Sequence, residues 1–168
     1  INRTSLMVEP DRTDPVLRPM GLHPAAIWAG YLGLLPFVAA LLCAVFGHGP
    51  LWWQVSERLA LGWGAAILGY VSAVHWGLAL AGRWPWTASI VLGSTLPSVL
   101  AAAAVLIGEG RGLALLVVGF GLFWLYEHRQ HQQDLPADYL ALRRNLSLTV
   151  CVLLAMTAIA LDNARMLS

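Results

Sequence analysis

Charged side chains are scarce in this sequence, and lysine is absent. Only 11% of the 168 residues are Asp, Glu, Lys or Arg, and all ten basic residues are arginine. A soluble domain usually carries about 25% charged residues, so this chain cannot cover a globule of its own with polar surface. Lipid must therefore be the solvent for most of it. The formal net charge of +1 excludes a polybasic nucleic-acid-binding protein.

Residues that carry chemistry are also few. Cys43 and Cys151 are the only cysteines, and both lie inside apolar segments, so we interpret them as small hydrophobic residues rather than as a disulfide or a metal pair. No nucleophile, base and orienting group occur together. The glycine-rich stretch 108–112 lacks the strand-to-helix setting of a phosphate-binding loop, and we interpret it as a tight turn. We predict that the protein is not an enzyme.

Five apolar segments approach or meet the length of about 20 residues that a helix needs to cross a bilayer. They cover residues 24–46, 57–81, 86–107, 112–126 and 142–161. The fourth is short, and the fifth extends a helix that begins after Pro136. The sequence therefore predicts an all-α integral membrane bundle of about five transmembrane helices. We place this transmembrane domain at residues 24–161, between a polar N-terminal tail (1–23) and a short C-terminal tail (162–168).

The arginines predict how the bundle is oriented, because basic residues favour the cytoplasmic side of a membrane. With five spans, the N-terminal tail, the second-to-third loop and the fourth-to-fifth loop share one side. That side carries Arg3, Arg12, Arg18, Arg83, Arg129, Arg143 and Arg144. The other side carries only Arg58, Arg111 and Arg165. We therefore predict that the N-terminus lies in the cytoplasm or matrix and the C-terminus outside.

Small residues recur every four positions along the second span. Ala65, Gly69, Ala73, Gly77 and Ala81 form this stripe. Small residues at such spacing let the backbone of another helix approach closely, and close packing largely drives helix association in lipid. The stripe predicts a helix-packing interface, whose partner is either this chain or another.

His75 is the one titratable side chain that the pattern places deep in an apolar span, pointing away from the small-residue stripe and alongside Ser72. An ionisable group inside a membrane is a candidate for function. Neutral imidazole is able to ligate haem iron or the magnesium of a chlorin, or to donate a hydrogen bond to a quinone. No second histidine lies at similar depth, as a b-type haem usually requires. The alternative is a structural histidine bonded to Ser72, a backbone carbonyl or a neighbouring helix.

A polar stretch, residues 127–134, follows the fourth span. On a helix, Glu127, His131 and Asp134 would share one face beside His128. A divalent metal uses such groups, but their spacing matches no closed site and the stretch lies at the water boundary. We interpret it as a solvated helix extension and predict no metal site.

Several short motifs, in order, resemble a known family. They are YLGLLPF at 31–37, VHWGLAL at 74–80, LPS at 96–98, GF at 119–120, and the run from LP at 135–136 through YL at 139–140 to LR at 142–143. In this order and spacing they resemble a family of small polytopic membrane proteins of unknown function from bacteria and mitochondria, whose animal member is named transmembrane protein sixty-nine. The resemblance covers roughly residues 22–150, and the segment around His75 is its most specific part. The family pattern has an aromatic residue where this chain has Asp138.

The resemblance implies a multi-helix bundle in the bacterial inner (cytoplasmic) membrane or the mitochondrial inner membrane. It supplies no known activity, catalytic residue or cofactor. Small size, the small-residue stripe and the lack of a soluble domain predict a non-catalytic accessory or assembly subunit of a larger bioenergetic complex, respiratory or photosynthetic. Its partners would be other transmembrane subunits and membrane lipids. The alternative is a small membrane protein that binds a chlorin, haem or quinone through His75. A transporter or channel is a third hypothesis, which the missing internal repeat and the missing series of buried acids and bases disfavour.

Overall fold

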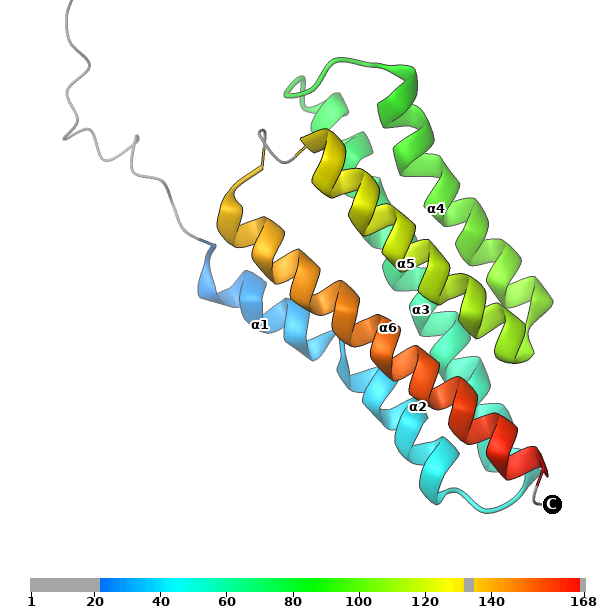
Figure 1. Ribbon diagram of the computed structural model, residues 1–168. Helices are drawn as coiled ribbons and strands as arrows, with labels where there is room; N and C mark the ends of the chain where they lie inside the picture. Colours follow the sequence, from blue (N-terminus) through cyan, green and yellow to red (C-terminus); the bar gives the residue numbers. More distant parts are fainter. Residues whose placement is uncertain (1–21, 132–134, 167–168) are drawn as a thin grey trace, which may run out of the picture.

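A computed structural model describes residues 22–131 and 135–166 of the chain. These residues form helices and connections, without a strand (Figure 1). The helices are α1 (Pro24–Leu32), α2 (Leu35–Phe46), α3 (Pro50–Leu80), α4 (Ala88–Ile107), α5 (Glu109–His131) and α6 (Ala137–Met166). Because α1 and α2 together make one span, five segments are long and apolar enough to cross a membrane. The predicted all-α membrane bundle is confirmed. Residues 1–21 of the predicted N-terminal tail lie outside the described residues.

The first span is interrupted between α1 and α2, and the sequence explains the break. Pro36 has no N–H and cannot continue the hydrogen bonds of the preceding turn. The N–H of Phe37 donates to the carbonyl of Leu34 at 3.0 Å. The indole Nε1 of Trp63, on α3, donates to the carbonyl of Gly33 at 2.9 Å. A side chain of a neighbouring helix therefore satisfies a backbone acceptor at the break, as membrane-embedded backbone requires.

Helices α3, α5 and α6 are longer than the apolar runs indicated. Helix α3 begins at Pro50, ahead of the predicted residue 57, because proline suits the first turn of a helix and Gly49 supplies the positive φ of 94° before it. Helix α5 begins at Glu109, so most of the predicted tight turn 108–112 is helical, and the span Glu109–Gln130 has 22 residues rather than being short. Helix α6 continues beyond residue 161 to Met166.

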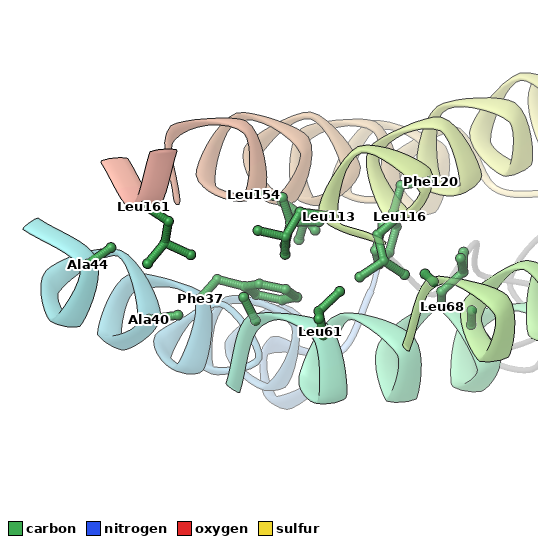
Figure 2. Close-up of a cluster of buried hydrophobic side chains, with 14 of the residues drawn as sticks. Phe37, Ala40, Ala44, Leu61, Leu68, Leu113, Leu116, Phe120, Leu154 and Leu161 are labelled. Carbon is green, nitrogen blue, oxygen red and sulfur yellow. The ribbon is translucent and has the colours of Figure 1, made fainter. Parts of the chain in front are cut away.

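The core lies where α3 packs against α2, α4, α5 and α6. Figure 2 shows its side chains converging between these helices. Its fully buried members include Phe37, Ala40, Leu61, Leu68, Leu113, Leu116, Phe120, Leu154 and Leu161. Two glycines let α3 and α5 approach. A Cβ on Gly64 of α3 would lie 2.7 Å from Leu116, and one on Gly119 of α5 would lie 2.8 Å from Leu68. Each glycine thus leaves room for a leucine of the other helix.

The bundle has two distinct ends (Figure 1). The His75 end holds the starts of α1, α4 and α6 and the ends of α3 and α5. The Glu57 end holds the end of α2, the starts of α3 and α5, and the ends of α4 and α6. Arginines group by end as the five-span topology requires. Arg83, Arg129, Arg143 and Arg144 belong to the His75 end, and Arg58, Arg111 and Arg165 belong to the Glu57 end.

Candidate functional site

A buried carboxylate, Glu127, links three helices at the His75 end. The Nε of Arg143 lies 3.1 Å from its Oε2, and the hydroxyl of Tyr139 donates to its Oε1 at 3.5 Å. The Nε2 of His75 lies 4.0 Å from the same Oε1. Because His75 belongs to α3, Glu127 to α5, and Tyr139 and Arg143 to α6, these four residues join the helices that form the core. We call them the Glu127 cluster.

The prediction of a solvated extension after the fourth span is wrong at Glu127. Only 1% of this residue is exposed, because α5 continues as a helix past the apolar run and packs against α6 there. His75 is also not the one ionisable group buried in the bundle, since Arg143 is only 8% exposed. Among the described residues, no group of three or more His, Cys, Asp or Glu side chains is placed to hold a metal ion. The side chain of His131 and residue Asp134 lie outside the described part.

Helical periodicity brings the cluster together. On α6, Tyr139, Arg143 and Ser147 follow one another at intervals of four, so they share a face, and Arg143 and Ser147 are buried on it. On α5, Phe123 and Glu127 are likewise four residues apart and both buried. Helical spacing therefore places Arg143 and Ser147 on the inward face of α6 and Glu127 on the inward face of α5.

Aromatic rings enclose His75, which is 1% exposed. Its ring centroid lies 5.3 Å from that of Trp84, 5.4 Å from that of Phe123 and 5.8 Å from that of Tyr126. The imidazole is therefore surrounded by protein groups, and a macrocycle the size of haem or a chlorin would have to displace them to reach it. His75 also lies only about one and a half turns from the end of α3, nearer the end of the span than its middle.

The Arg143 guanidinium has a mixed environment. Its central carbon lies 5.2 Å from the centroid of Phe123, within the range of a cation–π contact. Its Nε is paired with Glu127, whereas its Nη2 is buried and has no hydrogen-bond partner among the described residues.

The hydroxyl of Ser72, which was predicted to lie beside His75, contacts groups of α3 and α4 instead. Its hydroxyl donates to the carbonyl of Gly69 at 2.9 Å and lies 3.2 Å from the hydroxyl of Ser98 on α4. Ser72 is fully buried, so this contact joins α3 to α4 through polar atoms. It gives Ser72 a packing role independent of any ligand.

The predicted small-residue stripe divides into two parts. Ala65 and Gly69 are half-buried, and a Cβ on Gly69 would lie 3.7 Å from the Ser98 hydroxyl. Ala73, Gly77 and Ala81 are exposed, and Ala81 lies just past the end of α3. Within the described chain, only the first part faces a neighbouring helix.

A second polar group holds the Glu57 end together. The Oε1 of Glu57 accepts from the backbone N–H of Glu109 at 2.8 Å, where Glu109 adopts a positive φ of 52°. The Oε2 of Glu57 pairs with Arg165 of α6. A surface pocket of about 490 Å³ lies at the same end, lined by Leu42, Cys43, Phe46, Gly47, His48 and Trp52. It is separate from the Glu127 cluster.

One protein family matches most of the chain. The family described as "Protein of unknown function (DUF3429)" matches residues 22–159, which is most of the sequence. The chain belongs to the DUF3429 family. The matched region of this DUF3429 chain contains the whole Glu127 cluster and every residue of the predicted stripe. The predicted membership of a family of unknown function is thus confirmed. Neither a curated protein nor a solved structure matches the chain.

Sequence reasoning missed Glu127, Tyr139 and Arg143 as members of one site. The available signal was the four-residue spacing of Tyr139, Arg143 and Ser147 in a helix expected to enter the membrane. Charged residues at such positions need a partner, and Glu127 is the nearest acid on the preceding helix.

Proposed function

We propose that this small helical membrane protein is a non-catalytic accessory or assembly subunit of a larger bioenergetic complex, respiratory or photosynthetic. We place it in the bacterial inner membrane or the mitochondrial inner membrane, with its N-terminus on the cytoplasmic or matrix side. The observation that carries the proposal is a small-residue face of α3 that points away from the bundle.

This outer face of α3 consists of Gly62, Ala66, Ala73 and Gly77, which are all exposed. Consecutive members are about one or two helical turns apart, so they lie on one side of α3. A Cβ built on Gly62 or Gly77 would meet no atom of residues 22–131 or 135–166 within 4 Å. A face of this kind permits close approach of another helix in lipid. The spans also bury only 17–39% of their apolar windows within the chain, which leaves ample apolar surface for neighbouring subunits.

The packing of the core supports a role in which no proton or ion passes through the chain. The Glu127 cluster and the Glu57–Arg165 ion pair lie at opposite ends of the bundle. The buried side chains between them include Leu61, Leu116 and Leu154 (Figure 2). A proton or ion path requires a series of polar groups, and this packed apolar layer interrupts any such series in the described residues.

The Glu127 cluster also supports a non-catalytic role. Its carboxylate is neutralised by Arg143 and is 1% exposed, so a substrate has no direct access to it. A general base must come within hydrogen-bond reach of the proton that it removes. The arrangement suits a link between helices.

In-membrane photocrosslinking tests the proposal. Tyr70, which flanks the outer face and is 73% exposed, accepts a benzoyl-phenylalanine of similar shape, and Leu122 on α5, 56% exposed, is the matched control position. We expect irradiation of native membranes to join the Tyr70 probe to one larger protein and the Leu122 probe mainly to lipid. A Tyr70 probe that captures only lipid, or only a second copy of this chain, would contradict the proposal.

A further inference from the structure

One nitrogen of the Arg143 guanidinium is paired with a carboxylate, whereas another has no partner among the described residues. Its Nε pairs with Glu127 and its side chain is 10% exposed, while Nη2 is buried without a hydrogen-bond partner among the described residues. A buried donor left unsatisfied is costly, and more so when it is charged. We propose that the guanidinium of Arg143 holds a phosphate group, and that the source is the headgroup of an anionic phospholipid.

The charges around the site favour an anion. Glu127 balances Arg143, but the neighbouring Arg144 and Arg129 are exposed and form no ion pair with any described residue. All three arginines lie near the ends of α5 and α6 where the helices leave the apolar part of the span. The three arginines outnumber Glu127 and Asp138, the described acids of these two helix ends, so the edge of the bundle carries a net positive charge here. Basic sites between transmembrane helices at this level bind anionic headgroups.

The chemistry of the side chain suits phosphate. A guanidinium presents its N–H donors in a planar fork that matches the oxygens of a phosphate. Nε is engaged by Glu127, which leaves the other nitrogens of the guanidinium for a further acceptor, and a tenth of the side chain remains accessible. Phe123 and Glu127 fix the guanidinium, so it need not be reordered when a headgroup binds.

The first experiment uses the wild-type chain in mild detergent. Native mass spectrometry would compare binding of phosphatidylglycerol, which is anionic, with that of phosphatidylcholine, which carries a phosphate but no net charge. We expect about tenfold tighter binding of phosphatidylglycerol, the difference that one charge-assisted hydrogen bond supports. Equal binding of the two lipids would overturn the proposal without requiring any variant to fold.

The second experiment locates the site. The double variant Glu127→Gln with Arg143→Gln removes both charges of the buried pair and keeps amides that are able to bond to each other. Arg144→Gln is the control, because it removes one exposed positive charge from the next residue. We expect the double variant to lose the preference for phosphatidylglycerol and Arg144→Gln to keep most of it. Unchanged preference in the double variant would show that Arg143 is not the anchor.

Inorganic phosphate tests whether the phosphate group at Arg143 comes from a lipid headgroup or from free phosphate. We expect millimolar phosphate to leave both lipid binding and thermal stability of the wild type unchanged. Phosphate that displaces the lipid and raises thermal stability, but not in the double variant, would keep the phosphate site at Arg143 and overturn its assignment to a lipid.

Discussion

The carboxylate of Glu127 and the guanidinium of Arg143 form an ion pair across the α5–α6 interface, with Oε2 and Nε 3.1 Å apart and both side chains almost entirely buried. Breaking a buried pair by removing one partner leaves an uncompensated charge in a medium of low polarity, which costs about 3–5 kcal/mol. The pair therefore fixes how α5 and α6 meet at the His75 end.

We predict that Glu127→Gln and Arg143→Gln each lower the free energy of unfolding by about 3 kcal/mol, while the double variant loses clearly less than the sum. Reversible unfolding in mixed micelles would measure all three. Arg144→Gln should change stability by less than about 0.5 kcal/mol, because Arg144 is exposed. Strict additivity of the two single changes would contradict a coupled pair.

This pair also marks the limit of what the sequence reveals. Long apolar runs predict the spans well, because lipid tolerates little else, and five helical segments are long and apolar enough to cross a membrane. Composition does not reveal burial at the ends of those runs. Glu127 stands beside His128 and Arg129 and resembles a solvated stretch, yet the length of α5 carries it inside against Arg143.

Ser72 and the small-residue stripe show a second limit of the sequence. Helical spacing placed Ser72 beside His75, but its hydroxyl meets Ser98 because α4 crosses there. Spacing identifies a shared face and cannot name the helix that covers it. For the same reason the sequence left open what packs on Ala73 and Gly77, which prove to lie outside the bundle.

We predict that Trp63→Phe destabilises the protein by about 1 kcal/mol, because the ring remains and only the hydrogen bond to the Gly33 carbonyl is lost. Hydrogen exchange at the amides of α1 and α2 should quicken. Trp28→Phe, at a side chain 69% exposed, provides the control for loss of an indole. Equal effects of the two substitutions would show that Trp63 does not stabilise the break.

We predict opposite effects of alanine at two glycines. A Cβ on Gly93 would overlap the ring of Tyr126, which is held by its hydrogen bond to the Ser89 carbonyl at 2.8 Å. Gly93→Ala should therefore cost about 1–3 kcal/mol through overpacking. Gly121 of α5 has open space around it, so Gly121→Ala should stabilise the helix by up to about 1 kcal/mol. Thermal unfolding would compare them, and a neutral Gly93→Ala would contradict the packing described.

We predict that Gly77→Leu leaves the isolated chain folded but weakens its association with larger subunits. The leucine would fill the space through which another helix approaches α3, and its Cβ would meet no described atom within 4 Å. Gly121→Leu, an equal change at an open site on α5, should leave association intact. Quantifying the partners recovered with each variant would test this. Equal recovery would exclude the outer face as the docking surface.

Whether the protein is a subunit of a larger complex is tested by purifying the tagged chain from its native membrane in mild detergent and quantifying the accompanying proteins by mass spectrometry. We expect larger subunits of one respiratory or photosynthetic complex in fixed stoichiometry with the chain. Recovery of the chain alone, or only with copies of itself, would contradict it.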